Sequence, residues 1–212
     1  MNYEQPHRRY NPLTGTHVLV SPHRGKRPWQ GSREQPDRET VPAYDANCYL
    51  CPGNSRVGGA VNPEYKGPFV FKNDFPALLS DPGELPSEPG SLLRAESVRG
   101  TCRVICYSPR HDLTLAQLSQ AEVRGVVDTW VAETETLLAQ YRWVQVFENR
   151  GAAMGCSNPH PHNQIWALDA LPTEVAREDA CQRAHMAERG RPLLGDYLAE
   201  ESDERLVYEN ET

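Results

Sequence analysis

The stretch from Ser119 to Tyr141 constrains the fold more than any other part of the sequence. Its apolar side chains recur at intervals of three and four residues, which is the period of an α-helix that turns one face to a core. Ser119 and Glu122 have the spacing of a capping box at the first turn. The sequence therefore predicts a helix that covers a sheet here, with Trp130 in the core.

Strands dominate the first half of the sequence and helices the second. Short apolar runs indicate strands at about 16–20, 68–72, 103–108, 144–148 and 164–167. A second helix is expected over 172–189, with Gly190 just beyond its end. The connections are too varied for regular βαβ units, so we expect one α+β domain over residues 1–212, with a mostly antiparallel sheet covered by helices.

Composition and charge exclude several classes of protein. The net charge of −7 shows no basic excess of the kind that duplex nucleic-acid binders carry, so no nucleic-acid partner is expected. No apolar run approaches the roughly 18 residues of a membrane span. Six cysteines, in a chain whose first nine residues are polar, favour reduced thiols or metal ligands over disulfides. We therefore expect a cytoplasmic protein with no membrane partner.

Cys48 and Cys51 have the two-residue spacing that lets two thiolates bind one metal ion. Redox pairs share this spacing, but the pair does not open an evident βαβ unit. A tetrahedral structural zinc site needs two more ligands, and His111 and His160 are candidates because imidazoles usually complete such sites. The alternative interpretation is a pair of reduced cysteines beside a turn.

The segment Asn158 to Gln164 places two histidines around a proline. A histidine nucleophile needs a free lone pair on one ring nitrogen, while the other nitrogen donates its proton to a fixed acceptor. In an extended backbone His160, His162 and Gln164 point to one face. A metal on His160 could then anchor the backbone that aims His162, and the Gln164 amide could donate to a phosphoryl oxygen. The alternative is a polar loop with exposed histidines.

Two further segments could contact an anionic ligand. Residues 24–27 place three cations around a glycine, and arginine forks suit phosphate oxygens, although a solvated basic loop is the alternative. Asn149 closes a strand, and residues 150–155 form a loop of small residues where the backbone can approach a ligand closely. This loop lacks the Gly-Lys-Ser/Thr ending of a P-loop.

The segment from Gly155 to Gln164 resembles the active-site signature of the galactose-1-phosphate uridylyltransferases, a branch of the histidine-triad superfamily. Stretches similar to other family motifs occur at 9–15, 20–24, 26–31, 73–77 and 147–149. The resemblance covers the chain from about His7. It implies a half-barrel-like sheet of the histidine-triad type, and it corresponds to the N-terminal half of longer family chains whose second half has a similar fold.

The resemblance implies a ping-pong transfer in galactose metabolism. His162 would attack the α-phosphorus of UDP-glucose and release glucose 1-phosphate, and galactose 1-phosphate would then take the uridylyl group to give UDP-galactose. The implied substrate contacts are Arg24, Arg27, Val57, Asn73, Asp74, Asn149, Gly155, Cys156, Ser157 and Gln164. The implied metals are a structural zinc on Cys48, Cys51, His111 and His160, and an iron with Glu178 as its carboxylate ligand. A homodimer is also implied.

Gln164 separates two activities of the superfamily. Hydrolytic relatives have a histidine at this position, and a neutral carboxamide cannot act as the acid that assists hydrolysis, so Gln164 favours transfer. Asn163 occupies a position that is often small in the family, and we expect it to face away from the nucleophile.

The 212 residues lack some parts of the family's site. The histidines that complete the iron site, and the phosphate and sugar contacts of the second half, have no counterpart. The alternatives to the transferase are therefore a zinc-binding fragment that binds nucleotide without turnover and, less favoured, a nucleotidyl hydrolase. Half of such a fold should expose apolar surface and strand edges, which predicts poor solubility or tight association.

Overall fold

The computed structural model describes residues 3–28, 31, 41–86, 90, 92–151, 154–156, 158–201 and 207–208. The chain divides into two units, one made of residues 1–36 with 171–212 and the other of residues 37–170. The single domain expected over residues 1–212 stays a prediction. No helix in the described parts of the chain combines the length and the apolar character needed to cross a membrane.

The unit of residues 37–170 is built on a four-stranded antiparallel sheet with the order β3-β4-β6-β5. Its strands are β3 (Phe69–Lys72), β4 (Gly100–Cys106), β5 (Trp143–Phe147) and β6 (His162–Leu168). The central pair places His162 opposite Cys106 and Gln164 opposite Val104. The antiparallel α+β fold predicted from the sequence is confirmed, and β6 begins two residues earlier than predicted, at the nucleophile candidate itself.

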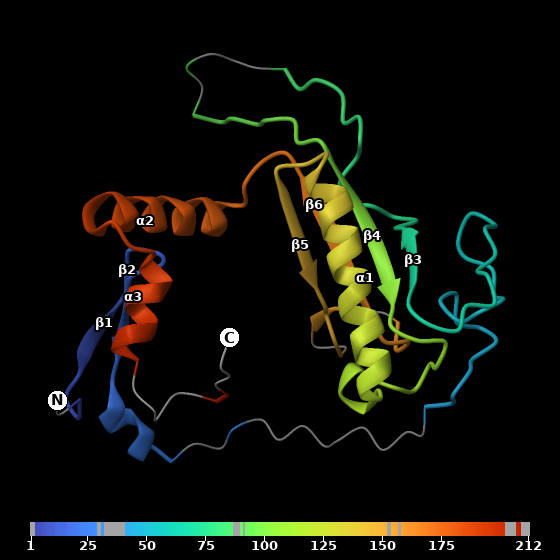
Figure 1. The fold of residues 1–212 in the computed structure, drawn as a ribbon, viewed down its shortest axis with the longest axis horizontal. Helices are drawn as coiled ribbons and strands as arrows, with labels where there is room; N and C mark the ends of the chain where they lie inside the picture. The colour runs from blue at the N-terminus through green and yellow to red at the C-terminus, as the bar shows by residue number, and fades with distance from the viewer. Residues whose placement is uncertain are drawn as a thin grey trace. The chain divides into compact units, whose positions relative to one another are not determined.

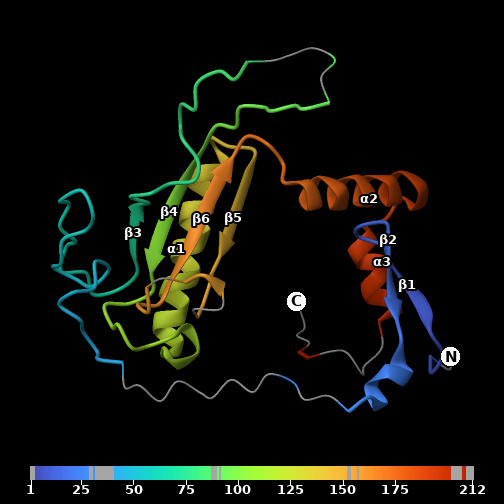
Figure 2. The same ribbon diagram turned by 180° about the vertical axis from the view of Figure 1, so that it is seen from behind.

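Helix α1 (Gln120–Leu138) covers one face of this sheet. It lies in front of the strands in Figure 1 and behind them in Figure 2, which is seen from the opposite side. The predicted capping box is present, since the Ser119 hydroxyl accepts a hydrogen bond from the backbone of Glu122. The buried face is narrower than the sequence pattern indicated, because Val131 and Leu138 are exposed while Val126 and Leu137 are buried.

Side chains of β6 alternate between two faces of the sheet. Ile165 and Ala167 are fully buried in the cluster that packs against α1. Asn163 shares this face, as expected, and is 1 % exposed. With its carboxamide oxygen directed to the helix, Asn163 Oδ1 accepts a hydrogen bond of 3.1 Å from Nε1 of Trp130. His162 and Gln164 lie on the opposite face.

The unit of residues 1–36 and 171–212 contains a hairpin and two helices. Strands β1 (His7–Asn11) and β2 (Thr16–Val20) pair antiparallel, and the positive φ of Gly15 allows the turn between them. A short 3-10 helix, η1 (Pro22–Lys26), follows β2 in this unit, whereas η2 (Leu115–Gln117) precedes α1 in the unit of residues 37–170. Helix α2 (Thr173–Arg189) ends at Gly190, as predicted, and α3 (Leu193–Glu200) follows.

Candidate active site and metal centre

Four buried side chains meet where the chain approaches β6. The thiols of Cys48 and Cys51 and the imidazoles of His111 and His160 bring one ligand atom each to within 4.8 Å of one another. Cys51 Sγ lies 3.5 Å from Nδ1 of both histidines. The four residues come from three separate loops, so the fold gathers the set that spacing alone could only suggest.

The donor set fits a metal ion. Two thiolates and two imidazoles form a tetrahedral set typical of structural zinc. Burial raises the pKa of Cys51 to about 11 and lowers the pKa of His160 to about 4. His160 is therefore neutral at pH 7 and has a lone pair for a metal, and a cation would offset the cost of burying thiolates at this place.

His160 connects this group to the nucleophile candidate. Its Nδ1 faces Cys51, and its Nε2 lies 3.1 Å from the carbonyl oxygen of Ser108. Its own backbone carbonyl oxygen lies 2.7 Å from Nδ1 of His162. Because a carbonyl can only accept, Nδ1 of His162 carries a proton, so that in the neutral ring the lone pair is on Nε2. Asn158 fixes the turn by accepting a 2.8 Å hydrogen bond from the backbone N–H of His160.

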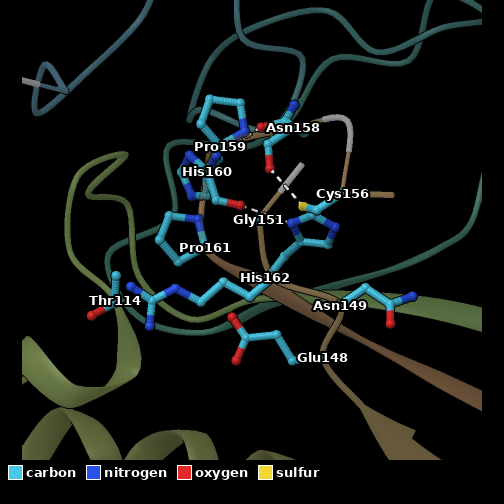
Figure 3. A pocket seen from close by; sticks show the side chains of 11 residues that line it. Thr114, Glu148, Asn149, Gly151, Cys156, Asn158, Pro159, His160, Pro161 and His162 are labelled. Atoms are coloured by element: carbon cyan, nitrogen blue, oxygen red, sulfur yellow. Dashed lines mark hydrogen bonds between the residues drawn. The ribbon is translucent and has the colours of Figure 1, made fainter. Parts of the chain in front are cut away.

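His162 lines a first pocket of about 290 Å³, shown in Figure 3. The pocket is lined by Thr114, Glu148, Asn149, Arg150, Gly151, Cys156, Asn158, Pro159, His160, Pro161 and His162. Burial raises the pKa of the Tyr107 hydroxyl, and the carboxylate of Glu148, its hydrogen-bond partner, raises it further. Sequence reasoning named Asn149 and Cys156 here but missed Glu148, although Glu148 lies within a quoted motif.

His162 also lines a second pocket, of about 480 Å³. This pocket is lined by Tyr49, Leu50, Val57, Phe71, Asn73, Asp74, Phe75, Val104, His162 and Gln164. The carboxamide oxygen of Gln164 accepts a 3.2 Å hydrogen bond from the indole of Trp166, so its N–H groups are the atoms it can offer to a ligand. The structure thus places Val57, Asn73, Asp74 and Gln164 in one pocket with His162, and their role as substrate contacts stays a prediction.

Arg56 supports the wall of this second pocket and was missed by sequence reasoning. Its guanidinium carbon lies 4.1 Å from the ring centre of Phe71, and its NH1 lies 3.8 Å from a carboxylate oxygen of Asp74. Phe71 and Asp74 both line the pocket, so the Arg56 guanidinium contacts an aromatic and an acidic side chain of the pocket wall.

Comparison with known proteins decides the family. A sequence profile described as "Galactose-1-phosphate uridyl transferase, N-terminal domain" matches residues 1–172. The chain belongs to this family. It is 52% identical over 210 residues to a galactose-1-phosphate uridylyltransferase of Haemophilus influenzae and 50% identical over 210 residues to that of Rattus norvegicus. These alignments cover 98% of this chain but only 60% and 55% of the two relatives, so the chain spans little more than half of their length.

Solved structures agree on the fold. A structure titled "Structure of uridylyltransferase" superposes with a TM-score of 0.65 at 24% identity, covering 96% of this chain and 58% of that one. An ADP-glucose phosphorylase from Arabidopsis thaliana with bound ADP-glucose gives a TM-score of 0.63 at 24% identity, covering 92% of this chain and 59% of that one. At these identities the likeness concerns the fold alone.

Three other residues of the implied uridylyltransferase site, Arg24, Arg27 and Glu178, do not belong to the unit that contains His162. Arg24 belongs to η1, Arg27 follows it, and Glu178 lies on α2, all within the unit of residues 1–36 and 171–212. Gly155 adopts a φ of 73°, which favours glycine, directly before Cys156. Ser157 lies outside the described residues.

Proposed function

We propose that this chain transfers a uridylyl group from UDP-glucose to galactose 1-phosphate through a covalent uridylyl-histidine at His162. The observation that carries the proposal is the 2.7 Å contact between Nδ1 of His162 and the carbonyl oxygen of His160. It leaves Nε2 as a nucleophile in a ring that lines two pockets. The names of the relatives support galactose 1-phosphate as a substrate and uridylyl as the group transferred.

In the first half of the reaction Nε2 of His162 forms a bond to the α-phosphorus. The bond from that phosphorus to the bridging oxygen breaks, and glucose 1-phosphate leaves with the electron pair. The proton stays on Nδ1 and is donated in a hydrogen bond to the carbonyl oxygen of His160, which stabilises the positive charge that develops on the ring. Gln164 donates to a phosphoryl oxygen through its amide. In the second half a phosphate oxygen of galactose 1-phosphate forms a bond to the same phosphorus. The bond from the phosphorus to Nε2 breaks, and UDP-galactose leaves.

Five of the proposed substrate contacts divide between the two pockets that His162 lines. Val57, Asn73 and Asp74 would hold the nucleotide in the second pocket, whose Phe71 and Phe75 offer aromatic surface to a base. Asn149 and Cys156 would contact the phosphate side in the first pocket. The remaining proposed contacts are Arg24, Arg27, Gly155 and Ser157.

We propose zinc as the ion held by Cys48, Cys51, His111 and His160, because this donor set and its burial suit zinc. Its contribution is structural: it fixes the backbone whose carbonyl orients His162. An iron bound through Glu178, a homodimer and a cytoplasmic location are further predictions from the resemblance.

Gln164 is proposed to keep the intermediate available for transfer. A histidine at this position could donate a proton and assist hydrolysis, whereas a carboxamide cannot titrate. Gln164→His should therefore slow uridylyl transfer and raise the rate at which the uridylyl-histidine is hydrolysed, measured as UMP release. Unchanged transfer together with unchanged hydrolysis in this variant would remove Gln164 from the mechanism.

A second candidate follows from the share of the relatives that this chain spans, which is 60% for the Haemophilus influenzae protein. Under it the chain binds zinc and nucleotide without turnover. Incubation with UDP-glucose labelled at the α-phosphorus separates the two, since transfer requires protein-bound label that is labile to acid and stable to alkali. Label on a longer chain but not on these 212 residues would support the second candidate.

A further inference from the structure

The loop that carries the two cysteine ligands is held by side chains along its whole length. Asn54 Nδ2 donates to the carbonyl of Cys48 over 2.8 Å. Asn62 Nδ2 donates to the carbonyls of Tyr49 and Cys51 over 2.9 and 3.0 Å. All four carbonyls from Cys48 to Cys51 are therefore bound, because the Tyr65 hydroxyl donates to Leu50 over 2.6 Å.

These three side chains, Asn54, Asn62 and Tyr65, form what we call the clasp. Loop carbonyls ordinarily bind water at the surface, so a full set of side-chain donors is unusual. Asn62 is its centre, since it is 3 % exposed and its amide nitrogen lies between two carbonyl oxygens, which fixes the orientation of the carboxamide. Within the described residues its Oδ1 is buried without a hydrogen-bond partner. A buried oxygen without a hydrogen-bond partner lowers the stability of the fold, so we expect the Asn62 side chain to have a role in the site.

The residues that the clasp holds serve two sites at once. Cys48 and Cys51, at the ends of the loop, belong to the metal group. Tyr49 and Leu50, between them, line the second pocket beside His162. The Leu50 carbonyl is bound by Tyr65, whose hydroxyl also lies 3.4 Å from Nε2 of His160. This four-residue loop thus carries a candidate metal ligand at each end, and its two middle residues line the pocket.

The clasp also fixes a second part of the pocket wall. Val57 lines the pocket and lies between Asn54 and Asn62 in the sequence. The intervening turn is closed by a 2.7 Å hydrogen bond from the backbone N–H of Arg56 to Ala60. Asn62 N–H donates to the Asn54 carbonyl over 2.9 Å, which joins the two ends of the turn. A shift of the loop from Cys48 to Cys51 would therefore move both parts of the pocket wall, namely Tyr49 with Leu50 and Val57.

We propose that the clasp couples the metal centre to the nucleotide pocket, with Asn62 as the positioning residue that transmits metal binding to nucleotide affinity. The metal orders Cys48 and Cys51, the clasp carries that order to Tyr49, Leu50 and Val57, and these side chains form the nucleotide wall. Coupling of this kind is reciprocal, so nucleotide must tighten metal binding by the same factor. The inference rests on the proposed function for the identity of the ligand in the second pocket.

The test measures the dissociation constant of UMP with and without zinc, and that of zinc with and without UMP, on the full 212-residue chain. Asn62→Ala removes the central donor. Asn163→Ala is the matched control, because Asn163 is an equally buried asparagine on the opposite face of the sheet. In the unaltered chain zinc should raise UMP affinity by about 10-fold, within the usual range of coupling between sites.

Asn62→Ala should reduce this factor towards 1 and weaken zinc binding by roughly 10-fold, which is typical when a partner of a metal ligand is removed. In Asn163→Ala zinc should still raise UMP affinity by the same factor, although this variant melts at a lower temperature than the unaltered chain. Coupling that survives in Asn62→Ala, or is lost equally in Asn163→Ala, overturns the inference. If Asn62→Ala does not fold, Tyr65→Phe removes one clasp donor with little change of shape, and an undiminished factor in that variant overturns the inference as well.

Failure of the proposed function gives a different result. A chain that binds zinc but not UMP would refute the nucleotide pocket, and the clasp would then be judged by zinc affinity alone. Equal zinc affinities for the unaltered chain and Asn62→Ala would overturn it. A chain that takes up no zinc refutes the metal centre, and the inference with it.

Discussion

The two faces of strand β6 carry different tasks. On the face under α1, Ile165 and Ala167 are fully buried in an apolar cluster. On the other face His162 and Gln164 line a pocket, and neither is fully buried. Because neighbouring residues of a strand point to opposite sides, stability and chemistry are separated by a single step along the chain. Substitutions on one face should therefore change melting, and those on the other should change reactivity.

Metal removal should have the largest effect and marks where this separation fails. The metal group lies at the end of the reactive face, yet a bound structural zinc stabilises the folded chain. Chelation is expected to release about one zinc per chain and to lower the melting temperature of the unit of residues 37–170 more than any single substitution does, while the unit stays folded at low temperature. Metal analysis together with circular dichroism measures both. A chain that stays folded with unchanged melting after the metal is stripped would remove the centre from the account.

His162→Ala tests the reactive face alone. Loss of the proposed nucleophile should reduce uridylyl transfer by roughly 10⁴-fold or more, because the covalent intermediate is proposed to form on its ring. The melting temperature should change little, since His162 is only half buried and packs outside the apolar cluster. Steady-state rates and thermal melting provide the two measurements. A large loss of stability would show that the two faces are not separate.

Ile165→Ala is the reverse experiment on the packed face. Its side chain is fully buried between the sheet and α1, so its truncation should lower the free energy of unfolding by about 2–5 kcal/mol. The protein that remains folded should still accept label at His162 at a rate close to normal. Denaturant titration and the labelling rate at low temperature check this. Strong loss of labelling by folded protein would mean that packing under α1 also sets the position of His162.

The smallest expected effect concerns the hydrogen bond between Trp130 and Asn163, which lies within the packed face. Trp130→Phe removes the 3.1 Å hydrogen bond to Asn163 and should cost about 1 kcal/mol. Trp143→Phe is the matched control, because among the described residues the indole nitrogen of Trp143 is buried without a partner and no hydrogen bond is lost. If both variants lose the same free energy of unfolding in denaturant titrations, the effect comes from the smaller ring and not from the lost hydrogen bond.

Local patterns were sufficient for most of the elements and for part of the site. The capping box and helical period predicted α1, and strand alternation placed His162 and Gln164 together and Asn163 opposite them. Strand β1 escaped prediction because its residues are mostly exposed and polar and show no alternation. A hairpin held by backbone pairing with β2 leaves little trace in such a sequence.

Long-range assembly limited what could be predicted of the site. The Cys48–Cys51 spacing suggested a metal, but only the fold brings His111 and His160 to it. Tyr49, Leu50 and Phe71 line a pocket, yet as apolar residues they cannot be told from core residues in the sequence. Asn62 acts through backbone carbonyls, which carry no sequence signal at all.

The most direct test of the proposed function is isotope exchange between labelled glucose 1-phosphate and UDP-glucose in the absence of galactose 1-phosphate. A covalent uridylyl-His162 can be formed and reversed by these two compounds alone, so the chain should exchange label and His162→Ala should not. Exchange that requires galactose 1-phosphate, or that persists in His162→Ala, would contradict the covalent mechanism.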